Sequence, residues 1–62
     1  MTKQIDLIDR GDAYEIHINV DTHAIQVIWE YLGNESTRPR AVQFEDLNPE
    51  LQRRIESKIA HG

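Results

Sequence analysis

Cysteine is absent from this chain, which excludes disulfides and thiolate metal sites and removes any sign of an oxidising compartment. A domain of 62 residues buries only about 60% of the surface that its unfolded chain exposes, so its hydrophobic core is marginal. Natural domains of this size usually gain stability from disulfides, a metal or a partner subunit. We therefore expect this chain to depend on a partner, either a second copy of itself or another protein.

Long apolar runs are absent as well. No stretch approaches the roughly 20 apolar residues that a membrane-spanning helix needs, and residues 1–8 lack the apolar run of a signal peptide. We predict a single domain over residues 1–62 in a cytoplasmic protein, and the small size without cysteine favours a bacterial or phage origin.

Positive charge is scarce, above all in the first part of the chain. The net charge is −4. Residues 1–35 hold seven acidic side chains and two basic ones, whereas residues 36–62 hold four acidic and five basic ones. Phosphate binding and attraction to anionic lipid both depend on Lys and Arg. The charge pattern thus disfavours nucleic acid and membranes as direct partners, and the same negative field would attract a basic protein.

The sequence contains no catalytic motif, no metal-ligand spacing and no phosphate-binding loop. Glu15, Glu30 and His17 are residue types that perform acid–base catalysis or bind a divalent cation. An exposed, flat sheet does not supply the concave, water-excluding pocket that such chemistry needs. We therefore predict a protein that is not an enzyme, with no cofactor and no metal.

What the sequence does contain is apolar–polar alternation with a period of two, which is typical of strands with one buried face. Turn signals at residues 9–12, where Gly11 can adopt positive φ, and at residues 21–23 divide the alternating segments. The apolar members of three long segments and one short one are Ile5 and Leu7; Tyr14, Ile16, Ile18 and Val20; Ile25, Val27, Trp29 and Tyr31; and Val42 and Phe44.

A helix is predicted after these four segments. Asn48 is a favourable N-cap and Pro49 suits the first helical position, while Gly62 suits a C-cap. One apolar stripe recurs every four residues, at Leu51, Ile55 and Ile59. The sequence therefore predicts an α+β fold (ββββα), in which a four-stranded antiparallel meander of order 1-2-3-4 packs one face against a C-terminal helix.

Burial of the apolar residues selects the strand register, because a slip of one residue turns a whole strand over. A two-residue turn at Arg10 and Gly11 pairs Leu7 with Tyr14. For the second and third strands, placing Val20 opposite Ile25 gives a four-residue loop. That register predicts that Trp29 lies in the core, beside Ile16.

The opposite face of the predicted sheet carries a row of three carboxylates, and like charges directly opposite one another are destabilising. A partner Arg or Lys would relieve this repulsion while its aliphatic stem covers neighbouring apolar side chains. We interpret this face as a partner-binding surface, formed by Asp6, Ile8, Glu15, His17, Ile28, Glu30 and Leu32. An ordinary solvated sheet face is the alternative interpretation, and the basic residues at 38–40 and on the helix form an alternative functional surface.

These observations predict a small acidic protein-interaction module that regulates or inhibits a basic, nucleic-acid-handling protein. The alternative is a structural homodimer that assembles through its sheet.

Overall fold

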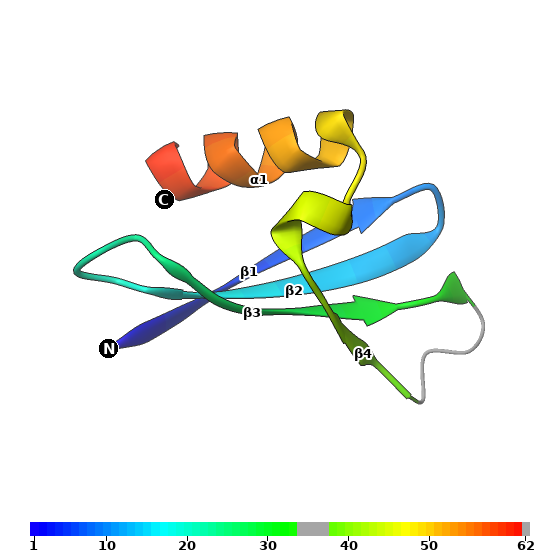
Figure 1. Cartoon of the computed structure of the whole chain (residues 1–62), viewed down its shortest axis with the longest axis horizontal. Coiled ribbons are helices and arrows are strands. Elements are labelled where there is room, and N and C mark those ends of the chain that lie inside the picture. Colours follow the sequence, from blue (N-terminus) through cyan, green and yellow to red (C-terminus); the bar gives the residue numbers. More distant parts are fainter. Residues whose placement is uncertain (34–37, 62) are drawn as a thin grey trace.

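The computed structural model describes residues 1–33 and 38–61. Four strands form one antiparallel sheet of order β1-β2-β3-β4, and the C-terminal helix lies across one face of it (Figure 1). The elements are β1 (Thr2–Asp9), β2 (Asp12–Asn19), β3 (Ile25–Tyr31), β4 (Arg40–Val42), the short 3₁₀ helix η2 (Phe44–Asp46) and α1 (Pro49–His61). The predicted α+β fold and strand order are confirmed. In the described part of the chain, no helix has the length and apolar character needed to cross a membrane.

The β1–β2 hairpin has the predicted register. Leu7 lies opposite Tyr14 and Ile5 lies opposite Ile16. The two turn residues both have positive φ, 52° at Arg10 and 85° at Gly11. A two-residue turn of this kind matches the right-handed twist of the flanking strands, so local turn chemistry and burial of the apolar residues favour the same pairing.

The β2–β3 register differs from the prediction by one residue. Tyr14 lies opposite Glu30, and Ile16 lies opposite Ile28 rather than Trp29. This slip turns the side chains of β3 to the other face of the sheet. Ile28 and Glu30 are therefore buried, with 1% and 8% exposure, and the prediction that Trp29 and Tyr31 lie in the core is wrong.

The loop between β2 and β3 explains the difference. The side-chain oxygen of Asn19 accepts hydrogen bonds from the backbone N–H groups of Asp21 (2.8 Å) and Thr22 (3.0 Å), and the Asn19 N–H donates to the carbonyl of Ala24. This turn ends the strand at Asn19, so Val20 lies in the loop and is 41% exposed. The four-residue loop is thus placed one residue earlier than predicted.

A β-bulge then changes the periodicity of β3. Ile18 pairs with Ile25 and His17 pairs with Val27, which leaves Gln26 without a partner across the pair. The extra residue allows Ile25 and Ile28, three positions apart, both to pack toward the core. A prediction based on strict alternation from Ile25 onward places Val27 and Trp29, rather than Ile28, on the same face as Ile25.

The fourth predicted segment is only partly a strand. β4 ends at Val42, and Phe44 begins η2 instead of continuing the alternation. The side chain of Gln52 on α1 donates hydrogen bonds of 2.9 Å to the carbonyls of Phe44 and Leu47. Phe44 and Leu47 also pack against the core, so contacts with the helix hold this segment away from β3.

Helix α1 begins as predicted. Asn48 caps it, because its side-chain oxygen accepts a 2.8 Å hydrogen bond from the Leu51 N–H. Leu51 and Ile55 are buried against the sheet, and Ile59 packs beside them. Burial of each such side chain contributes about 1.5–3 kcal/mol. The predicted C-cap, Gly62, lies outside the described residues.

Candidate functional site

The sheet face opposite α1 is covered by no other element in the described part of the chain (Figure 1). We call this surface the outer face. Strand alternation and the observed register place ten residues at its centre: Gln4, Asp6, Ile8, Ala13, Glu15, His17, Val27, Trp29, Tyr31 and Ala41. None of them is Lys or Arg, so the outer face is acidic and apolar.

Two carboxylates and an indole ring form the middle row of the outer face. Asp6 pairs with Glu15 on β2, and Glu15 pairs with Trp29 on β3. The predicted row of three carboxylates is therefore wrong, because the position expected for Glu30 is occupied by Trp29. The neighbouring row ends in Tyr31, so the acidic pair lies beside two aromatic side chains.

Hydrogen bonds orient these carboxylates. The Glu15 Oε1 atom lies 3.4 Å from His17 Nε2, and Gln4 donates a 2.8 Å hydrogen bond to Asp6. The pKa of Tyr31 is raised, chiefly by the interaction of its hydroxyl with the Glu15 carboxylate. Within residues 1–33 and 38–61, neither Asp6 nor Glu15 forms an ion pair with Lys or Arg.

The apolar part of the outer face is partly accessible to solvent. Ile8 is 70% exposed, and Val27, Trp29 and Tyr31 are half-buried. An uncovered aromatic and aliphatic surface next to hydrogen-bonded carboxylates has the mixed character of a protein-binding surface.

The structure brings together four of the seven predicted site residues. Asp6, Ile8, Glu15 and His17 lie on the outer face, and Leu32 lies just beyond the end of β3 with 39% exposure. The other two, Ile28 and Glu30, lie on the inner face, because of the one-residue slip.

Sequence reasoning assigned three members of the outer face to the core instead: Val27, Trp29 and Tyr31. One signal was present in the sequence. Ile28 stands out of phase with the apolar series that contains Trp29, so β3 has apolar residues on both faces and either face was a candidate for the core.

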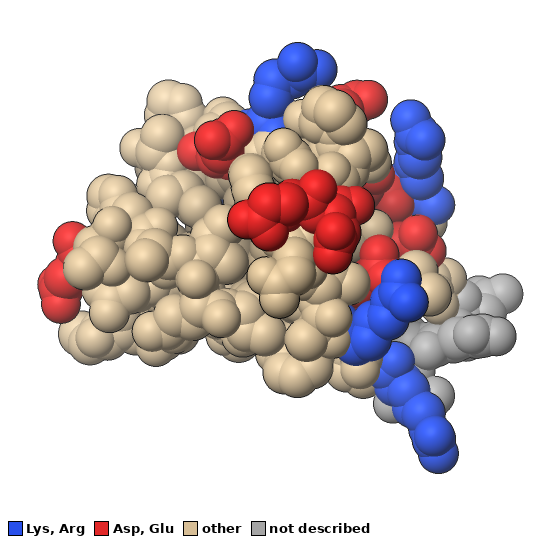
Figure 2. Space-filling model, in the orientation of Figure 1, with Lys and Arg blue, Asp and Glu red and all other residues tan. Residues whose placement is uncertain are grey.

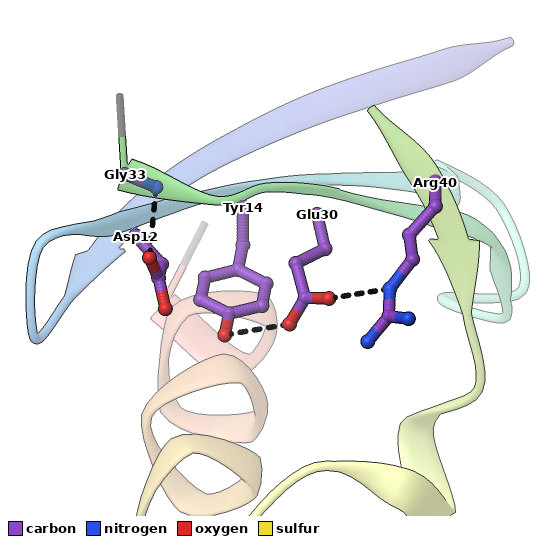
Figure 3. Close-up of polar contacts among 5 residues, drawn as sticks. All are labelled: Asp12, Tyr14, Glu30, Gly33 and Arg40. Atoms are coloured by element: carbon purple, nitrogen blue, oxygen red, sulfur yellow. Dashed lines mark hydrogen bonds and ion pairs between the residues drawn. The ribbon is translucent and has the colours of Figure 1, made fainter. Parts of the chain in front are cut away.

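Glu30 takes part in a different arrangement on the inner face (Figure 3). Its Oε2 atom accepts a 3.0 Å hydrogen bond from the hydroxyl of Tyr14, and its Oε1 atom accepts a 2.8 Å hydrogen bond from Arg40 Nε. Both carboxylate oxygens are thus satisfied, which removes most of the cost of burying the charge. Burial, followed by the contact with Glu30, raises the pKa of Tyr14 to about 12. The cluster of Tyr14, Glu30 and Arg40 also fastens β4 to the sheet.

The alternative basic surface is partly used for internal contacts. Arg40 is bound to Glu30, and Arg54 of α1 lies 3.2 Å from Asp9 at the end of β1. Arg38 and Arg53 are exposed. Two of the four arginines considered for this surface are therefore engaged in contacts within the chain.

No group of three or more His, Asp or Glu side chains in residues 1–33 and 38–61 is arranged to hold a metal ion. Comparisons with models of protein families, with curated proteins and with solved structures found no match to this chain. The geometry of its own surfaces is thus the basis for any functional proposal.

Proposed function

We propose that this chain is a non-enzymatic protein-interaction module whose outer face binds a basic surface on a partner protein. The observation that carries the proposal is the composition of that face. Glu15 lies between Asp6 on one side and Trp29 on the other, and the ten residues of the outer face include no Lys or Arg. The partner would insert Arg or Lys side chains into this arrangement.

Arg fits the middle row better than Lys does. A planar guanidinium can bind a carboxylate with two hydrogen bonds and stack on an aromatic ring at the same time. Glu15 and Trp29 are directly opposite one another on β2 and β3, so both contacts are available to one side chain. The aliphatic stem of the same residue would cover Val27 or Ile8.

A second copy of this chain fits the outer face less well. Face-to-face packing of two copies would bring the Asp6 and Glu15 carboxylates of each together without Lys or Arg to neutralise them, and like charges at an interface are costly. A basic partner removes that repulsion. Proteins that handle nucleic acid carry such basic surfaces, and occupation of one by this chain would regulate or inhibit its partner.

The test uses a peptide of about ten residues that alternates arginine with flexible glycine, and a matched peptide in which glutamate replaces arginine. The chain has a single tryptophan, so fluorescence of Trp29 reports contact with the outer face directly. We expect the arginine peptide to change this fluorescence, the glutamate peptide to leave it unchanged, and the affinity to fall as salt increases.

Two neutralising variants provide the control. Glu15→Gln should weaken binding by about tenfold, equivalent to the loss of ~1.4 kcal/mol, whereas Glu50→Gln, on the exposed start of α1, should not. Equal effects of the two variants would show that only the overall charge attracts the peptide, and the proposed site would be wrong. Concentration-dependent dimerisation that persists in high salt would support the homodimer instead.

A further inference from the structure

Part of β3 has an open edge on the side of β4. β4 pairs only with residues Ile28–Glu30 of β3. Continuation of the same register would place Gln43 beside Val27, but the chain turns into η2 instead. In the described part of the chain, the β3 edge from Ile25 to Val27 therefore has no strand partner on this side.

A groove of about 630 Å³ runs along this open edge. Its walls are residues 25–28 of β3, residues 41–45 of β4 and η2, and His23, Glu56, Ile59 and Ala60. Across the bulge, Ile25 and Ile28 face the core while Val27 faces the outer face. The groove contacts residues from both sides of the sheet, as expected of a hollow that follows the backbone edge.

The groove combines apolar and polar side chains, and its charged groups are acidic. Ile25, Val42, Phe44 and Ile59 provide the apolar lining, and the carboxylates are those of Glu45 and Glu56. No Lys or Arg lines it, and within residues 1–33 and 38–61 neither glutamate forms an ion pair. In the view of Figure 2, acidic atoms lie over the middle of the molecule. No Lys or Arg atoms lie over its left part, where Figure 1 places the β2–β3 hairpin.

We infer that this groove binds an extended segment of another protein, which adds to the sheet as a strand beside Ile25–Val27. The backbone of the segment would pair with the open edge, its apolar side chains would enter the groove, and a Lys or Arg would face Glu45 and Glu56. Strand addition to an exposed edge is a common mode of peptide recognition, in which backbone hydrogen bonds supply affinity and pockets supply specificity.

A second copy of the chain is a poorer occupant. The open edge of each copy lies within its own groove, bordered by the same two glutamates. Pairing of two such edges would bring four carboxylates together, and charged side chains at a strand edge are a known protection against such self-association. Charge complementarity therefore selects a basic segment from a different protein. This site shares Val27 and Ala41 with the border of the outer face, but its apolar lining and its two glutamates lie outside that face.

The test is a titration of the isotopically labelled chain with a peptide of about six residues, a typical strand length, that alternates lysine with valine. We expect slower hydrogen exchange of backbone amides within Ile25–Val27 and shifted NMR signals for Phe44 and Ile59. A second peptide of the same sequence, with methyl groups on all of its backbone nitrogens, keeps the charge and the side chains but loses its backbone donors on both edges. It should bind about tenfold more weakly.

Matched glutamate variants test the charge requirement. Glu56→Gln and Glu45→Gln should each weaken binding several-fold. Glu50→Gln, on the same helix as Glu56 but outside the groove, should not. Equal binding of the methylated peptide, shifts confined to the outer face, or absence of binding at millimolar peptide would each overturn the inference. Because the deciding signals are those of Phe44 and Ile59, which do not belong to the outer face, failure here leaves the proposal for the outer face unaffected.

Discussion

The hydroxyl of Tyr14 donates a 3.0 Å hydrogen bond to the carboxylate of Glu30 across the β2–β3 pair, within the hydrophobic core. The second carboxylate oxygen is bound by Arg40. This contact makes the observed register possible, because an unpaired carboxylate at the same position would carry a large desolvation cost. The orientation of β3, and with it the composition of the outer face, depends on it.

Removal of the Tyr14 hydroxyl should therefore destabilise the fold. In Tyr14→Phe the Glu30 carboxylate loses one partner and remains buried, so we expect a loss of about 1–3 kcal/mol in the free energy of unfolding. Tyr31→Phe removes a hydroxyl from the outer face and is the matched control, with a smaller expected effect. Urea denaturation of both variants measures the difference, and equal stabilities would show that the Tyr14–Glu30 contact contributes little.

Stability should also fall at high pH. The pKa of Tyr14 is raised from 10.0 to about 12 in the folded chain, so above pH 10 the unfolded chain loses this proton more readily than the folded one. The contribution is fully present below pH 10 and is lost as the pH rises to about 12, with a maximum near 2–3 kcal/mol. Denaturation of the parent and of Tyr14→Phe across this range isolates the contribution. Parallel pH profiles would contradict the assignment.

The register predicts opposite behaviour for two adjacent residues. Ile28→Ala creates a cavity in the core and should cost about 2–5 kcal/mol. Trp29→Ala removes a larger side chain, but from the outer face, so we expect a loss within about 1 kcal/mol. Thermal unfolding of the two variants distinguishes the registers, since the alternative register, with Trp29 in the core, predicts that Trp29→Ala is the more damaging change.

Charge reversal should separate the two faces in the same way. Glu30→Lys would place an ammonium group beside Arg40 in a buried position, and we expect this variant not to fold. Glu15→Lys changes an outer-face residue and should leave the circular dichroism spectrum unchanged. Folding of Glu30→Lys with normal stability would show that Glu30 is accessible to solvent.

The sequence was sufficient to predict the elements, their order and the β1–β2 pairing, since the Arg10-Gly11 turn and the apolar residues favour the same answer. The β2–β3 pairing was not predictable by alternation alone. Three features decide it: the turn centred on the Asn19 side chain, the bulge at Gln26 and the burial of Glu30 by partners distant in the sequence. Simple binary patterning assigns a glutamate to the surface and a tryptophan to the core.

The predicted placement of the candidate site residues was likewise right where it rested on the β1–β2 pairing and wrong where it rested on the β2–β3 pairing. Asp6, Ile8, Glu15 and His17 follow from the well-determined β1–β2 hairpin, and their placement on the outer face was predicted. Ile28 and Glu30 depended on the register of β3, so the error in that register exchanged them for Trp29 and its neighbours. The groove beside β3 depends on the early end of β4, which is caused by contacts between η2 and Gln52 of α1.

The most direct test of the outer face is a map of the backbone and indole NMR signals that shift when the arginine–glycine peptide is added. We predict that the largest shifts occur at the indole N–H of Trp29 and at the amides of Asp6, Glu15 and His17, and that α1 is unaffected. Shifts centred on α1 and on residues 38–40, with Trp29 unchanged, would contradict the account and place the functional surface on the opposite side of the molecule.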